Sequence, residues 1–222
     1  MEDLRIEKQF ELGIWLPGVV SKRDYLLRLQ ADSLLLGGNK RLLFPELQIK
    51  CDERIAVTGP NGSGKSTLIK HIVGSLNMPK ERLTYIPQEI DARGSQELMT
   101  RIKDIPRDKL GILMTIVSRL GSRPQRLLDS AEPSPGETRK LLLALGMVYA
   151  PHIIVMDEPT NHMDLPSIEC LEDALLDCPC SLILVSHDKH FLGKLTKKYW
   201  SIQKDSSSED TFILNIRYHE DC

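Results

Sequence analysis

Short apolar stretches separated by turn residues occupy the chain between residues 25 and 58. Apolar and polar positions alternate in several of them, as in Leu47-Gln48-Ile49, which is typical of half-buried strands. The sequence Gly37-Gly38-Asn39 is a strong turn signal between two of these stretches. We therefore predict a series of short strands at residues 25–30, 34–36, 42–44, 47–49 and 54–58.

The pattern changes to helical spacing in the middle of the chain. A helix is predicted at residues 67–73 and one more strand at 82–86. Between residues 95 and 128, Leu110, Leu113, Met114 and Val117 fall on one helical stripe. Another helix is predicted at residues 136–149. These segments indicate a separate helical subdomain.

Two wholly apolar runs, at residues 153–156 and 181–185, are typical of strands buried on both faces of a parallel sheet. Residues 168–176 fit a helix that joins them, which predicts a strand–helix–strand unit. Residues 199–202 and 211–216 predict a closing hairpin.

Length and charge narrow the class of protein without identifying it. The 222 residues suit one large domain, and the formal net charge of −2 gives no overall sign of nucleic-acid binding. Charge is nevertheless uneven, because residues 101–126 hold seven basic and two acidic side chains, whereas residues 151–180 hold seven acidic side chains and no Lys or Arg. The basic stretch is either a solvated helical face or a docking surface for a polyanion.

The cysteines and the hydropathy indicate the compartment. The five cysteines show no spacing typical of a disulfide framework, which favours a reducing environment. No apolar run approaches the length needed to span a bilayer, and no signal peptide opens the chain. We therefore expect a cytoplasmic protein with no transmembrane segment of its own.

A phosphate-binding loop follows the apolar run at residues 54–58. Its sequence is Gly59-Pro60-Asn61-Gly62-Ser63-Gly64-Lys65-Ser66-Thr67, which matches the pattern G-x-x-x-x-G-K-S. Glycines let the backbone turn its N–H groups toward phosphate oxygens. Lys65 would supply a positive charge to the β- and γ-phosphates, and the Ser66 hydroxyl would ligate Mg²⁺. The helix that follows adds its N-terminal dipole to the anion site.

Two adjacent carboxylates, Asp157 and Glu158, end the apolar run at residues 153–156. At the end of a buried parallel strand, Asp157 would emerge beside the phosphate loop and hold Mg²⁺ through its water shell. Glu158 would face the γ-phosphate, where it orients or deprotonates the attacking water. The two motifs together predict hydrolysis of a nucleoside triphosphate.

Further motifs, in a fixed order, resemble those of the ATP-binding-cassette (ABC) ATPases over nearly the whole chain. Tyr85-Ile86-Pro87-Gln88-Glu89 resembles the glutamine loop of that family, and Ser134-Pro135-Gly136-Glu137 resembles its signature loop. Val185-Ser186-His187-Asp188 resembles the histidine switch, and Asn161-His162-Met163-Asp164 is similar to the loop that crosses the dimer interface.

The resemblance implies a role for each motif. Gln88 would contact Mg²⁺ and the lytic water, His187 would reach the γ-phosphate, and Asp164 would lie at a dimer interface. The signature residues Ser134, Gly136 and Glu137, at the start of a helix, would form a second anion site for the nucleotide of another cassette. Two cassettes would then sandwich two ATP molecules and separate after hydrolysis.

The resemblance also implies the fold, an α/β P-loop cassette in which an antiparallel β subdomain and a parallel sheet form a mixed β core. We expect residues 1–222 to form one such domain, with the helical signature subdomain inserted at about residues 95–150.

The chain departs from the family pattern at two places. Pro133 and Pro135 replace a leucine and a glycine of the signature, and Pro135 removes one backbone N–H. The aromatic residue that the family commonly stacks on adenine is not evident, since residues 34–36 are all leucine. Tyr25 and Phe44 are the candidate substitutes, with plain core packing as the alternative for each.

The run from Asp157 to Leu165, DEPTNHMDL, resembles the one typical of the ABC-F branch, whose members lack membrane spans and act on ribosomes. It implies a ribosome-acting ATPase, in translation regulation or in protection against antibiotics, with the ribosome and its RNA as partner. The alternative is the motor subunit of a membrane transporter. ABC-F proteins usually carry two cassettes, so the partner cassette would lie in the same full-length chain or in a second copy, and this chain is expected to be a C-terminal cassette.

Overall fold

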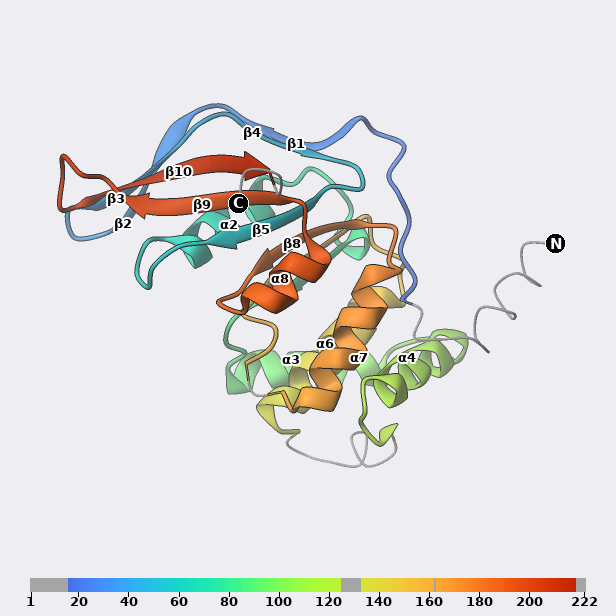
Figure 1. Cartoon of the computed structure of the whole chain (residues 1–222). Coiled ribbons are helices and arrows are strands. Elements are labelled where there is room, and N and C mark those ends of the chain that lie inside the picture. The colour runs from blue at the N-terminus through green and yellow to red at the C-terminus, as the bar shows by residue number, and fades with distance from the viewer. Residues whose placement is uncertain (1–15, 125–132, 162, 219–222) are drawn as a thin grey trace.

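The computed structural model describes residues 16–124, 133–161 and 163–218. Figure 1 shows the strand-rich part of the molecule on one side and most of the helices gathered on the other. The larger sheet has eight strands in the order β2-β3-β10-β9-β5-β8-β7-β6. A separate antiparallel pair is formed by β1 (Tyr25–Leu29) and β4 (Leu47–Lys50).

The larger sheet is mixed, as predicted. Five neighbouring strands are parallel: β9 (Lys198–Lys204), β5 (Arg54–Thr58), β8 (Ser181–Val185), β7 (Ile153–Asp157) and β6 (Leu83–Ile86). β10 (Thr211–Tyr218) closes a hairpin with β9 and runs parallel to β3 (Lys40–Phe44), which pairs antiparallel with β2 (Asp32–Gly37). The parallel strands and the hairpin confirm the sequence-based expectation of a mixed β core.

Three predicted helices form close to their expected places: α2 (Lys65–Ser75), α6 (Pro135–Met147) and α7 (Leu165–Leu176). A short helix, α8 (Lys189–Leu195), and a 3₁₀ turn, η1 (Lys80–Arg82), were not predicted from the sequence. The stretch predicted at residues 95–128 divides into α3 (Ala92–Lys103) and α4 (Arg107–Arg119). The break falls at Pro106, because the residue before a proline is disfavoured in helical geometry. Residues 125–128 of that prediction lie outside the described residues. None of the described helices is long and apolar enough to cross a membrane.

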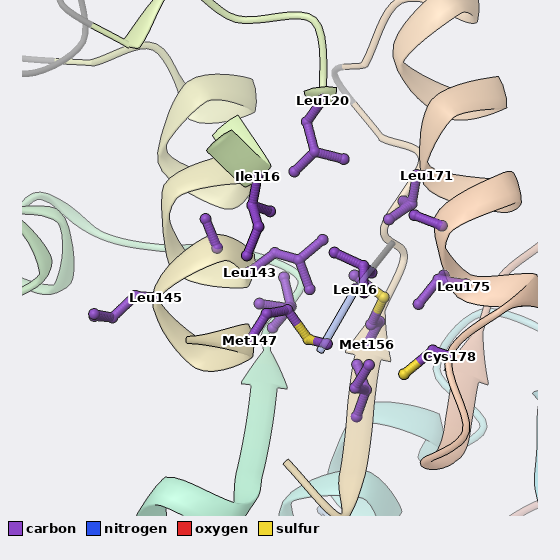
Figure 2. Close-up of a cluster of buried hydrophobic side chains, with 14 of the residues drawn as sticks. Leu16, Ile116, Leu120, Leu143, Leu145, Met147, Met156, Leu171, Leu175 and Cys178 are labelled. Atoms are coloured by element: carbon purple, nitrogen blue, oxygen red, sulfur yellow. The ribbon is translucent and has the colours of Figure 1, made fainter. Parts of the chain in front are cut away.

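Alternate residues of the parallel strands enter two different hydrophobic cores. In β7, Ile153 and Val155 belong to the core that contains α2 and the antiparallel strands, whereas Ile154 and Met156 belong to the core formed with α4, α6 and α7. Figure 2 shows part of the second core, with Met156 among side chains from α6 and α7. Successive side chains of a strand point to opposite faces, so a strand buried on both faces has a continuous apolar sequence.

We predict that Gly146→Ala destabilises the protein, because α6 lies very close to β6. A Cβ atom at Gly146 would lie 2.4 Å from Thr84 Oγ1 and 2.9 Å from Thr84 Cβ, so the helix or the strand must shift. Overpacking of this kind costs about 1–3 kcal/mol in the free energy of unfolding, measured by urea titration.

The matched control is Gly111→Ala in α4, where no described atom outside the helix backbone and the two neighbouring residues lies within 4 Å of an added Cβ. This variant is expected to gain about 0.5–1 kcal/mol, because alanine loses less backbone entropy in a helix. Equal effects of the two substitutions would contradict the close packing of α6 on β6.

Candidate active site

The carboxyl ends of four parallel strands bring the predicted motifs to one edge of the sheet. The phosphate loop follows β5 and His187 follows β8; Asp157 ends β7, Glu158 comes directly after it, and Gln88 follows β6. These strands are neighbours in the order β5-β8-β7-β6. Ligands of open α/β sheets bind at this edge, where the loops between strands and helices diverge.

A cavity of about 530 Å³ lies at this edge. The phosphate loop contributes Asn61, Gly62, Gly64, Lys65, Ser66 and Thr67 to its wall. The other motifs contribute Gln88, Asp157, Glu158, Asn161 and His187. Gly59, Pro60 and Ser63 belong to the same loop but do not line the cavity, and Ser63 is fully buried.

Two glycines of the phosphate loop have left-handed backbone conformations. Gly62 and Gly64 have φ angles of +74° and +94°, in the left-handed region that residues with a Cβ disfavour. Gly64 is also the N-cap of α2, and a Cβ there would lie 2.5 Å from Leu36 Cδ2. The turn therefore places the N-terminus of α2 directly at the cavity, where its dipole favours an anion.

Lys65 is held inside the loop by the loop's own carbonyl groups. Its ammonium donates to the carbonyl oxygens of Gly59, at 2.9 Å, and Pro60, at 3.2 Å. Burial lowers the pKa of Lys65, while the nearby carboxylates of Glu158 and Asp157 act in the opposite direction. The charge is thus already positioned at the cavity wall.

The two carboxylates are almost inaccessible to solvent: Asp157 is 2% exposed and Glu158 is 6% exposed. Burial raises the pKa of both carboxyl groups. The largest opposing effect on the pKa of Asp157 is a hydrogen bond with the Ser66 hydroxyl, and the largest on the pKa of Glu158 is the nearby His187. His187 Nε2 lies 3.6 Å from Glu158 Oε1 and 3.1 Å from Asn61 Oδ1. This arrangement places the Glu158 carboxylate beside the His187 imidazole.

The residues at this edge fit a divalent cation. Within the described part of the chain, Asp157 Oδ1 and Glu158 Oε1 are buried without a hydrogen-bond partner. Buried oxygens of this kind are normally satisfied by protein, water or an ion. Ser66 and Gln88 line the same cavity as Asp157, and neutral and charged oxygens are the ligands that Mg²⁺ prefers.

The raised pKa of Glu158 predicts an acid limb in the pH profile of ATP hydrolysis. A carboxylate expected to act as the general base must be deprotonated, so kcat should rise with pH through a pKa above the ordinary value of 4.5. ATP affinity measured by calorimetry at each pH separates a loss of kcat at low pH from a loss of ATP binding. If the residual activity of Glu158→Gln kept the same limb, the limb would belong to another group, such as Asp157.

The signature residues stand apart from the cavity. Ser134 is the N-cap of α6, and its Oγ accepts from the N–H of Glu137 at 3.3 Å while the Glu137 carboxylate accepts from the N–H of Ser134 at 2.9 Å. Pro135 occupies the first turn, where a missing N–H costs no intrahelical bond, so the proline fits the helix start. Ser134, Gly136 and Glu137 are not among the residues that line the cavity.

Asp164 also lies outside the cavity lining, where it caps α7 by accepting from the N–H of Ser167 at 3.2 Å. His162, in the same predicted loop, lies outside the described residues.

The cavity has an aliphatic residue where an aromatic one was sought. Leu36 lines it, and neither Tyr25 nor Phe44 does. The Arg28 guanidinium lies 3.7 Å from the ring centroid of Tyr25, and Phe44 is buried in the core. The structure therefore favours core or surface packing for both aromatic candidates.

Sequence reasoning missed two buried cations on α6, Arg139 and Lys140. Arg139 donates to the backbone carbonyls of Gln88, Glu158 and Asn161, and Lys140 Nζ donates to Ser167 Oγ at 2.8 Å. The available signal was a pair of adjacent cations opening an otherwise apolar helix. The sequence pattern does not distinguish such a buried pair from two cations exposed to solvent near the end of a helix.

This fold and cavity define a P-loop nucleotide-binding protein. Residues 45–161, more than half of the chain, match the family described as ABC transporter. The chain therefore belongs to the ATP-binding-cassette family of ATPases, which confirms the resemblance found in its motifs.

The chain is similar to relatives of the ABC-F branch. ATP-binding cassette sub-family F member 2 of Bos taurus is 30% identical over 176 residues, which cover 72% of this chain and 28% of that protein. Ribosome protection protein VmlR of Bacillus subtilis is 30% identical over 179 residues, which cover 76% of this chain and 33% of VmlR. The chain spans about a third of the length of the curated relatives that it matches.

A solved complex of an archaeal ribosomal stalk protein with the archaeal ribosome recycling factor aABCE1 shows the same fold. Its matching chain has a TM-score of 0.66 at 19% identity, and the match covers 91% of this chain and 41% of that one.

Proposed function

We propose that this ATP-binding cassette hydrolyses ATP only when a second cassette completes its site. The cavity gathers Lys65, Ser66, Gln88, Asp157, Glu158 and His187, whereas Ser134 lies outside it on α6. This division of the site residues is the observation that carries the proposal. Ser134 and Gly136 would contact the nucleotide of the partner cassette, and Asp164 would lie at the interface between the two.

Each residue at the cavity has a proposed task. The loop from Gly59 to Thr67 and the N-terminus of α2 bind the phosphates, and Lys65 exchanges its carbonyl partners for phosphate oxygens. Ser66, Gln88 and Asp157 would hold Mg²⁺, which supplies charge neutralisation at the phosphates when bound. Glu158 orients the attacking water and accepts its proton, and His187 reaches the γ-phosphate.

We further propose that the cassette acts on the ribosome in the cytoplasm, in translation regulation or in protection against antibiotics. The name of VmlR describes a ribosome protection protein, and this supports the same partner here. In the described part of the basic stretch, four basic side chains are exposed, which suits contact with ribosomal RNA: Arg101, Lys103, Arg107 and Arg123. The second candidate is the motor subunit of a membrane transporter, which the description of the matching family favours.

Sedimentation with ribosomes tests the choice of partner. Glu158→Gln is expected to pellet with ribosomes in the presence of ATP, because it should trap the closed sandwich. The matched control is the double variant Lys65→Ala with Glu158→Gln, which cannot bind ATP and should stay in the supernatant. No ATP-dependent pelleting would contradict the ribosome proposal and leave the transporter candidate.

A further inference from the structure

Arg139 is a buried cation enclosed by backbone carbonyl groups. It is 5% exposed, and its guanidinium donates to the carbonyl oxygens of Gln88, Glu158 and Asn161. A guanidinium stays charged in proteins and presents five donors in a planar fork, so it can serve several acceptors at once. Burial of such a charge is costly unless its donors are satisfied. The three carbonyls supply that compensation.

The three acceptors belong to different segments of the catalytic edge. Gln88 follows β6, Glu158 follows β7, and Asn161 lies ahead of α7. Arg139 itself belongs to α6, the helix that Ser134 caps. One side chain therefore connects the signature helix with the segments that carry the proposed base and a proposed Mg²⁺ ligand.

The contact with Glu158 falls on a strained part of the backbone. Glu158 has a φ angle of +51°, a left-handed conformation that costs roughly 1–2 kcal/mol for a residue with a Cβ. Its N–H donates to the carbonyl of Val185 at 2.8 Å, and its carbonyl accepts from Arg139 Nη1 at 3.3 Å. Hydrogen bonds on both sides thus hold the conformation that directs the Glu158 carboxylate, and Arg139 provides one of them.

Lys140 anchors the same helix to a different point. Its ammonium donates to Ser167 Oγ at 2.8 Å. The N–H of Ser167 in turn donates to the carboxylate of Asp164, the N-cap of α7. Lys140 is 8% exposed, which is close to the 5% of Arg139. Both residues are cations of α6. The hydrogen bond of Lys140 goes to α7 and not to a peptide group of Glu158. Lys140 therefore provides a matched control.

We propose that Arg139 is a positioning residue that couples α6 to Glu158 and Gln88. This inference rests on the proposed sandwich, in which Ser134 at the start of α6 meets the nucleotide of the partner cassette. When α6 of one cassette docks on the nucleotide bound by its partner, Arg139 fixes the backbone of Glu158 in the first cassette. Glu158 then acts on the nucleotide bound by its own cassette. The two sites of the dimer are thereby linked through Arg139, and ATP hydrolysis is cooperative.

Steady-state hydrolysis by Arg139→Gln and Lys140→Gln tests this role, with ATP affinity measured by calorimetry and folding by thermal unfolding. Arg139→Gln is expected to lower kcat roughly 10- to 100-fold at unchanged ATP affinity, because small displacements of a reacting group have effects of this size. Its Hill coefficient for ATP should fall toward one from a wild-type value above one. Lys140→Gln should lower the unfolding temperature while it keeps cooperativity and a kcat closer to wild type.

Arg139→Lys keeps the charge but cannot reach three carbonyls with fixed geometry, so it should restore part of kcat. It also carries the test if Arg139→Gln does not fold. Equal losses of kcat in Arg139→Gln and Lys140→Gln, or unchanged kcat and cooperativity in either Arg139 variant, would overturn the coupling role. A wild-type protein that binds ATP without turnover, even at concentrations that favour dimers, would instead overturn the proposed function.

Discussion

Replacing Lys65 with alanine is expected to abolish measurable ATP binding. Lys65 is 8% exposed, and its ammonium already donates to the carbonyls of Gly59 and Pro60 in the phosphate loop. Bound phosphates would offer it a stronger, charged acceptor in the same place. Removal of one partner from a buried charge pair costs about 3–5 kcal/mol, which corresponds to roughly a 100- to 4000-fold loss of affinity.

Isothermal calorimetry measures this loss, and thermal unfolding without nucleotide checks that the fold survives. Lys70→Ala is the matched control, because Lys70 lies on the same helix, is exposed and does not line the cavity. It should bind ATP nearly as well as the wild type. An unchanged affinity of Lys65→Ala would show that the phosphates bind elsewhere.

Replacing Glu158 with glutamine is expected to separate binding from turnover. The amide has the shape of the carboxylate but cannot accept a proton from water. The loss of a general base lowers kcat by roughly 10²- to 10⁴-fold. ATP affinity should be retained or increased, since the substitution removes a negative charge close to the phosphates.

Phosphate release measured under saturating ATP gives kcat for this variant. The same chemical change at Glu169, an exposed residue of α7, provides the control and should leave turnover unaltered. Stability should not fall, because the buried charge is costly and, among the described residues, Glu158 Oε1 has no hydrogen bond to lose and only the 3.6 Å contact with His187. Retained hydrolysis by Glu158→Gln would assign the base to a different residue.

The parts of the fold that depend on local pattern were predictable. The apolar runs at residues 153–156 and 181–185 correspond to β7 and β8, and the helix predicted between them corresponds to α7. Helix ends were less predictable: α2 begins at Lys65, because the left-handed Gly64 directly precedes it. A glycine conformation of this kind depends on the packing of the loop and is not apparent from hydrophobic periodicity.

The same distinction applies to the candidate site. Motifs of fixed spacing identified Lys65, Ser66, Asp157 and Glu158, since a short loop holds its own residues together wherever it lies. The parallel pairing of β5, β8, β7 and β6 was needed to bring Gln88 and His187 to the same cavity. The sequence already showed leucine at residues 34–36, where an aromatic residue was sought, but only the structure shows that Leu36 lines the cavity.

By itself, the sequence of this protein determined its strands, its helices and the order of its chemical motifs, because these follow from neighbours within a few residues. Only the tertiary structure decided which motifs share one cavity and which, like Ser134, do not line it. It also decided that Arg139 is buried against three carbonyls and not solvated. The physical reason is that burial and hydrogen-bond partners depend on segments distant in sequence, which only the packed sheet and helices bring together.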